Sequence, residues 1–184
     1  MNSNSETNSY FIGYIFKEEM KPLSAIQHKI SQDVNVEKVL PLHTPFIYLG
    51  KLKEELANQF LQYLNPLFLA IVENNGPLHS TFQSFKFVKM NHKYYFVICY
   101  ENENLENHII PFLKKFGTDH IIETHYLDKN HLYIPLSVSK DINQEIKDIV
   151  HIPYNPNFEI DSIDVYKVNK YNEISVVTTY PLEK

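Results

Sequence analysis

The first half of the chain alternates between strand-like and helix-like patterns of apolar residues. Aromatic and β-branched residues fill positions 10–16, which predicts a strand. Over 18–31 the apolar residues recur at roughly helical spacing, which predicts an amphipathic helix. A second strand is expected over 42–49, because the apolar run there stops at Gly50, and a second amphipathic helix is expected over 53–64.

The second half repeats this order of elements. The expected elements are strands over 85–90, 94–100, 131–138, 158–168 and 173–180, and helices over 105–116 and 140–150. Strand–helix–strand modules that occur twice, with antiparallel hairpins added, predict an α+β protein. We expect two pseudo-symmetric lobes of antiparallel sheet, with helices on the outer faces and a central groove between the lobes.

Composition sets the class of protein. The chain has 184 residues, 43% of them hydrophobic and 21% charged, which is ordinary for a globular protein with a substantial core. The polar stretch 1–9 is expected to be a disordered leader rather than a targeting signal, and 10–184 is expected to form a single bilobal domain. No apolar run approaches the roughly 18 residues that span a bilayer. The lone cysteine, Cys99, excludes an internal disulfide and fits a reducing cytosol. We expect a cytoplasmic protein that does not contact a membrane, and we expect it to be a monomer.

The charge of the chain limits its partners. The net charge is −5, and all 17 basic residues are lysine. Arginine is the side chain best suited to hold phosphate in a bidentate manner, so its absence removes that mode of recognition. An acidic surface also disfavours broad contact with the backbone of duplex nucleic acid. A phosphate-bearing partner is therefore expected to be a small nucleotide or an RNA end.

Two histidines stand at the start of the strand-like runs in the two halves. His43 opens the segment His-Thr-Pro-Phe-Ile-Tyr-Leu-Gly, and His131 opens His-Leu-Tyr-Ile-Pro-Leu. Two imidazoles that meet in one groove can cleave a phosphodiester, because one accepts a proton while the other gives one. For each histidine taken alone, a hydrogen-bonded structural role is the alternative.

Alternation of side chains along a strand assigns neighbouring residues to opposite faces. It predicts that His43 shares a face with Pro45 and Ile47, and that Thr44 and Tyr48 face the other way. Thr44 would turn toward the histidine face only if a bulge preceded Pro45.

The second histidine run has the same two-faced pattern. His131, Tyr133 and Pro135 are expected to share one face of their strand. Proline cannot donate to a strand ladder, so Pro45 and Pro135 indicate strand edges or bulges.

The arrangement resembles the 2H phosphoesterase superfamily, which includes 2'-5' RNA ligase-like proteins and cyclic nucleotide phosphodiesterases. Its hallmark is a pair of His-x-(Thr or Ser)-x motifs on strands of two pseudo-symmetric lobes, and the similarity extends over about 10–182. In that family the first strand often continues through apolar positions to Leu-Gly, as Leu49-Gly50 does here. The resemblance implies that His43 and His131 act as general acid and base, with no metal or other cofactor.

This sequence departs from the family pattern at both hydroxyl positions. Pro45 and Tyr133 stand two residues after the histidines, where the resemblance implies threonines that hydrogen-bond the phosphate. Proline has no donor, and a tyrosine hydroxyl lies several ångströms further from the backbone than that of threonine. Thr44 is one residue out of register. We therefore name Thr44, Pro45 and Tyr133 as candidate substrate-binding residues.

Other side chains with potential chemistry give weaker signals. Tyr126 and Phe82 are candidates for stacking on a base, with core packing as the alternative for each. His120 and His125 lie close together but lack a third ligand at a useful spacing, so no metal site is expected. With four glycines in the chain, no glycine-rich phosphate loop is present.

Three functions are compatible with these expectations. The first is a phosphoesterase of the 2H type, active in RNA processing on a 2',3'-cyclic phosphate or a 2'-5' linkage. The second is a weakened or inactive module of the same fold that binds a nucleotide or RNA end without turnover. Loss of an oriented donor typically costs two to three orders of magnitude in rate, so the missing threonines do not decide between these two. The third is a protein-interaction domain that no longer uses the groove, in which His43 and His131 would not face each other.

Overall fold

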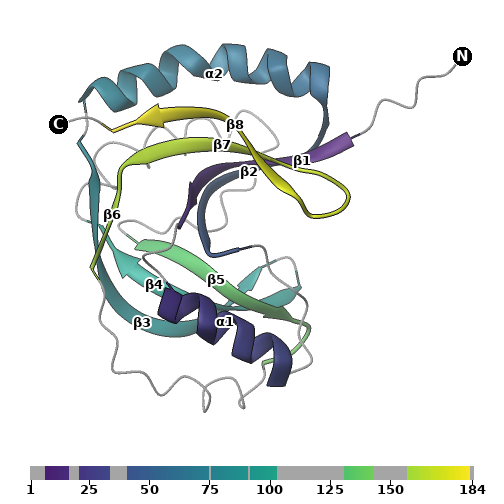
Figure 1. The fold of residues 1–184 in the computed structure, drawn as a ribbon, viewed down its shortest axis with the longest axis vertical. Coiled ribbons are helices and arrows are strands. Elements are labelled where there is room, and N and C mark those ends of the chain that lie inside the picture. The colour runs from purple at the N-terminus through teal and green to yellow at the C-terminus, as the bar shows by residue number, and fades with distance from the viewer. Residues whose placement is uncertain are drawn as a thin grey trace, which may run out of the picture.

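The computed structural model describes residues 7–16, 21–33, 41–74, 76–90, 92–102, 131–142 and 157–182. These segments form an α+β fold with two lobes, each built on a four-stranded antiparallel sheet, which confirms the predicted fold class. Sheet A has the order β2-β1-β7-β8, and sheet B has the order β5-β4-β3-β6. The two sheets face each other, with β3 and β6 running along the side where the lobes join (Figure 1).

The strands of the two sheets come from different parts of the chain. Sheet A contains β1 (Thr7–Ile15), β2 (His43–Lys53), β7 (Ser162–Val168) and β8 (Ile174–Pro181). Sheet B contains β3 (Leu78–Met90), β4 (Lys93–Glu101), β5 (His131–Ser139) and β6 (Phe158–Ile160). The hairpin formed by β7 and β8 therefore belongs to the first lobe, because β7 pairs with β1.

Helix α1 (Lys21–Asp33) packs beside sheet B. Its apolar residues Leu23, Ile26 and Ile30 are buried, and their spacing of three and four residues places them on one face. They share a core cluster with Ile134 on β5, and Figure 1 shows α1 lying against that strand.

Helix α2 (Glu54–Asn74) covers sheet A and contacts β1, β2 and β8 (Figure 1). The sequence pattern predicts an end at residue 64, but the helix continues through Pro66 for another two turns. Phe68 extends the buried face of the first half, and its ring stacks on Tyr180 with centroids 5.1 Å apart. Burial of this face outweighs the cost of an interior proline, about 3 kcal/mol.

Several predicted boundaries move in the structure. The first strand begins at Thr7, inside the predicted leader. The predicted strand over 158–168 is divided at Asp161 into β6 and β7, which belong to different sheets. Residues 140–142 are not helical, and the predicted helix over 105–116 lies outside the described residues, as does the rest of the predicted helix over 140–150.

Candidate functional site between the two sheets

His43 is the first residue of β2, and its imidazole is almost completely buried, with 1% of the residue exposed. Its Nδ1 atom lies 2.7 Å from the carbonyl oxygen of Pro41. A carbonyl can only accept a hydrogen bond, so Nδ1 carries the proton and donates it. The other ring nitrogen, Nε2, lies 3.2 Å from the hydroxyl oxygen of Tyr48.

Burial keeps this imidazole neutral. The pKa of His43 falls from its ordinary 6.5 to about 4, because desolvation disfavours the charged ring, and the hydrogen bond to Pro41 opposes this only in part. At neutral pH the ring therefore has one proton, on Nδ1. Its Nε2 lone pair accepts the hydrogen bond that the Tyr48 hydroxyl donates.

The backbone before His43 is held by the neighbouring strand. The amide of Phe16 donates to the carbonyl oxygen of Leu42 at 3.0 Å, which extends the pairing of β1 and β2 beyond their last ladder partners, Ile15 and His43. This bond fixes Pro41 next to the imidazole that it orients. The tautomer of His43 thus follows from local backbone structure.

Two irregularities in the pairing of β1 with β2 decide which side chains accompany His43. The register shifts between Ile12 and Gly13 and again between Tyr10 and Phe11, which leaves Phe46 and Leu49 as extra residues on β2. The prediction that Tyr48 faces away from His43 is therefore wrong. Strict alternation fails here because a bulge advances the strand by one residue, so that Tyr48 reaches the histidine face.

Gly13 makes the first irregularity possible. A Cβ atom at this position would lie 2.3 Å from the carbonyl oxygen of Thr44 and 3.0 Å from the Cα of Pro45. Only glycine allows the backbone of β2 to approach β1 so closely.

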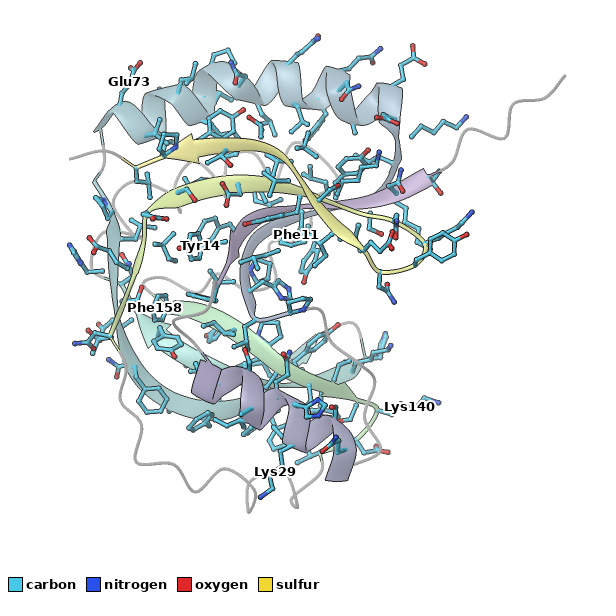
Figure 2. The ribbon with its side chains drawn as sticks, viewed as in Figure 1. Phe11, Tyr14, Lys29, Glu73, Lys140 and Phe158 are labelled. Atoms are coloured by element: carbon cyan, nitrogen blue, oxygen red, sulfur yellow. The ribbon has the colours of Figure 1, made fainter. Side chains whose placement is uncertain are left out.

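Aromatic side chains surround the imidazole on the sheet A side. The ring of Phe11 lies 5.3 Å from that of His43 and 5.9 Å from that of Tyr48, centroid to centroid. Phe11 also stacks on Tyr166 at 4.8 Å. Figure 2 shows Phe11 and Tyr14 in the interior, whereas Glu73 of α2 points away from it.

Tyr48 connects the two sheets. It packs against a cluster of sheet A that contains Phe11 and Tyr166, and also against a cluster of sheet B that contains Tyr133 and Cys99. Neither cluster contains a residue of the described helices. Tyr48 is partly exposed, so its side chain is the link between the buried histidine and the face of sheet B.

Tyr133 lies on this face of β5 and is 5% exposed. Its hydroxyl accepts a hydrogen bond of 2.9 Å from the Nζ atom of Lys86 on β3, and the same ammonium lies 4.5 Å from the centre of the Tyr133 ring. Lys86 is half-buried and reaches across β4 to make this contact. We refer to His43, Tyr48, Tyr133 and Lys86 together as the inter-sheet site.

His131 is the first residue of β5 and pairs with Glu101 in the ladder. Its strand packs against β2, the strand that begins with His43. Pro45 lies on β2 and Pro135 on β5, which are edge strands, and each proline adjoins a register shift. The prediction that these prolines mark edges or bulges is confirmed.

The remaining candidate residues lie elsewhere. Thr44 pairs with Tyr14 and is fully buried, and its hydroxyl has no hydrogen-bond partner among the described residues. Phe82 packs against Phe85 and Tyr100 in the core. Tyr126, with His120 and His125, lies outside the described residues.

A second polar group lies on β7 of sheet A. Asp164 is 8% exposed and accepts hydrogen bonds through Oδ2 from the hydroxyls of Tyr166, at 2.7 Å, and Ser162, at 3.2 Å. The Tyr166 hydroxyl in turn accepts from the amide of Ile15 at 3.0 Å. Burial, together with the hydrogen bond to Asp164, raises the pKa of Tyr166 above its ordinary value. This network ties β7 to the end of β1.

Sequence reasoning did not identify Lys86 or Tyr48 as members of the site. A signal for Lys86 is present, because Phe85 and Phe87 flank it in a strand-like run and place it on the opposite face. No comparable signal reveals Tyr48, because its position depends on the bulge.

Within the described segments, no three side chains of the metal-ligating types gather as a metal site. None of the helices described there has the length and apolar character needed to span a membrane.

These features define a two-lobed α+β fold, and the overall architecture is LigT-like. Two solved structures share it over nearly their whole length. TT0787 of Thermus thermophilus superposes with a TM-score of 0.58 and 14% identity, covering 95% of this chain and 97% of its own. LigT of Escherichia coli in its apo form gives 0.52 and 11% identity, covering 98% of this chain and 100% of its own. No model of a protein family matches the sequence, and no curated protein matches it.

Proposed function

We infer that the chain is a phosphoesterase that hydrolyses a small nucleotide or RNA-end phosphodiester, with His43 as general base and His131 as general acid. The observation that carries this inference is the state of His43. Its proton is held on Nδ1 by Pro41, and its Nε2 lone pair points at a hydroxyl. That is the arrangement in which an imidazole removes a proton from water or from a ribose hydroxyl.

The fold supports the same function. Its solved neighbours include a protein named LigT. In this chain the strands that begin with His43 and His131 pack against each other. We therefore assign to His131 the proton donation that the second imidazole performs in the predicted pair.

The reaction follows from these two roles. Water attacks phosphorus while His43 takes its proton on Nε2, the bond from phosphorus to the ribose oxygen breaks, and His131 gives its proton to that oxygen. For a 2',3'-cyclic phosphate the product is a ribose monophosphate, and for a 2'-5' linkage it is a phosphate monoester with a released hydroxyl. A phosphate anion next to His43 raises the pKa of the imidazole above about 4, which makes it a stronger base when substrate is bound.

Access to His43 requires Tyr48 to move. The imidazole is 1% exposed, and its single free lone pair already accepts from Tyr48. A reacting hydroxyl must take the place of the Tyr48 hydroxyl on Nε2. Tyr48 is partly exposed, so rotation of one side chain brings the base into contact with ligand.

The same observation favours a second candidate function. A base with a pKa of about 4, covered by a tyrosine, fits a module that binds a nucleotide or RNA end without cleaving it. Both candidates place the ligand phosphate between the two sheets.

The test is a cleavage assay with a 2',3'-cyclic nucleotide, a 2'-5' dinucleotide and a 3'-5' dinucleotide. The wild type is expected to cleave at least one of the first two. His43→Ala and His131→Ala should each lose roughly 100-fold to 10,000-fold in rate, whereas His79→Ala, at an exposed histidine that faces Glu159, should retain it. Binding without cleavage would support the binding module. If the protein neither binds nor cleaves any of these ligands, both candidate functions are overturned.

A further inference from the structure

We propose that Lys86 and Tyr133 form a phosphate-binding pair that supplies the positive charge of the inter-sheet site. The pair lies on sheet B, across from the strand that carries His43, and Tyr48 packs against its cluster. The proposal deepens the proposed function, on which it rests for the position of the ligand.

The hydrogen bond between the two residues runs from Lys86 to Tyr133. A lysine ammonium has three donors and no acceptor, so the Tyr133 hydroxyl accepts from Lys86. The proton of that hydroxyl is then left to donate. Among the described residues, the Lys86 ammonium is the hydroxyl's one hydrogen-bond partner.

Burial makes this remaining donor significant. Tyr133 is 5% exposed, and a hydroxyl donor that is largely shielded from water is less stable without an acceptor. An anion bound between the sheets would accept this proton and lie next to the ammonium. Donation from a charged lysine also polarises the phenol, which strengthens the hydrogen bond that the phenol makes to an anion.

Charge also favours this pair. The chain has a net charge of −5 and no arginine, so lysine is the permanently charged side chain available to a phosphate group. Lys86 is half-buried and lies within 4.5 Å of the centre of a nearly buried aromatic ring, where solvent screens its charge less than at an open surface.

The chain offers a matched control on the same strand. The Nζ atom of Lys89 lies 5.4 Å from the centre of the Tyr94 ring, so it forms a second lysine–tyrosine pair. Lys89 is exposed, and three residues along a strand place it on the face opposite Lys86. Substitution of either lysine by methionine removes one positive charge and keeps a stem of similar length.

The experiment is calorimetric titration of adenosine 3'-monophosphate and of uncharged adenosine into the wild type and four variants. Lys86→Met should weaken the monophosphate about tenfold to a hundredfold, and Tyr133→Phe about fivefold, with little change for adenosine. Lys89→Met and Tyr94→Phe should bind both as the wild type does. Thermal midpoints show whether each variant is folded.

Equal losses for Lys86→Met and Lys89→Met would overturn the proposal, because the effect would then be one of overall charge. Absence of monophosphate binding by the wild type would overturn it as well. The probe has no diester to cleave, so its binding is independent of turnover. If the monophosphate binds through Lys86 and no diester is hydrolysed, the catalytic assignment fails while the phosphate-binding pair stands.

Discussion

The Nε2 atom of His43 accepts a hydrogen bond from the hydroxyl of Tyr48, five residues along the same strand. Regular alternation would place these two residues on opposite faces, and the bulge at Phe46 brings them together. Tyr48 therefore occupies the one ring atom of His43 through which the histidine can act as a base.

Tyr48→Phe should free that atom. The variant keeps the ring that packs between the sheets and removes a competing hydrogen bond of about 1 kcal/mol. Because a reacting hydroxyl would no longer have to displace it, kcat/KM for diester cleavage should rise about fivefold. Steady-state kinetics of Tyr48→Phe measures this change in kcat/KM. Tyr171→Phe, which alters an exposed tyrosine, is the control. A tenfold fall would mean instead that the Tyr48 hydroxyl takes part in the reaction.

Burial of His43 makes the stability of the protein depend on pH. The pKa of the imidazole is about 4 in the folded protein and 6.5 ordinarily, so between these values the unfolded chain holds a proton that the folded chain lacks. The contribution is fully present above pH 6.5 and is lost as the pH falls toward 4, about 3 kcal/mol in all.

Urea unfolding at about pH 7 and about pH 4.5 measures this change. His43→Gln should remove most of the difference between the two conditions, and His79→Gln should leave it in place. An unchanged pH dependence in His43→Gln would assign acid sensitivity to other groups.

The close approach of β1 and β2 at Gly13 gives a prediction for the fold around the site. Gly13→Ala places a methyl group 2.3 Å from the Thr44 carbonyl oxygen, so the strands must separate. We expect a loss of about 3 kcal/mol, the upper range for overpacking. Gly50→Ala meets no atom within 4 Å but has a φ of +77°, and it should cost about 1 kcal/mol. Denaturant unfolding of both variants ranks them, and the reverse order would contradict the role of Gly13.

Some parts of the site can be predicted from local sequence patterns, whereas others depend on packing between distant residues. His43 is visible in the sequence because it opens an apolar run, and the edge prolines are visible because they interrupt such runs. The fold is predictable because apolar residues recur with the periods of strands and helices. The continuation of α2 through Pro66 is not visible, because the packing of Phe68 on Tyr180 offsets the local cost of the proline. The pairing of His43 with Tyr48 depends on a bulge, and Lys86 and Tyr133 are two residues 47 positions apart on different strands.

The hydrogen bond between Asp164 and Tyr166 should contribute to stability as a coupled pair. Both side chains are buried, so a double-mutant cycle with Asp164→Asn and Tyr166→Phe should give a coupling of about 1–3 kcal/mol. The exposed bond of 2.6 Å between Asn169 and Glu173 is the comparison and should couple by less than about 0.5 kcal/mol. The coupling energies are obtained from free energies of unfolding. Equal values for the two pairs would show that burial does not strengthen the hydrogen bond between Asp164 and Tyr166.

The protonation state of His43 decides whether this residue can act as the base, and nitrogen NMR of the protein with ¹⁵N-labelled histidine reports that state. At neutral pH we expect a neutral ring with its proton on Nδ1, and no protonation of Nε2 until the pH approaches about 4. The ring-nitrogen resonances that are absent from the spectrum of His43→Gln are those of His43. A ring that carries its proton on Nε2 at neutral pH, or one that becomes doubly protonated near the ordinary pKa of 6.5, would contradict the assignment of His43 as the base.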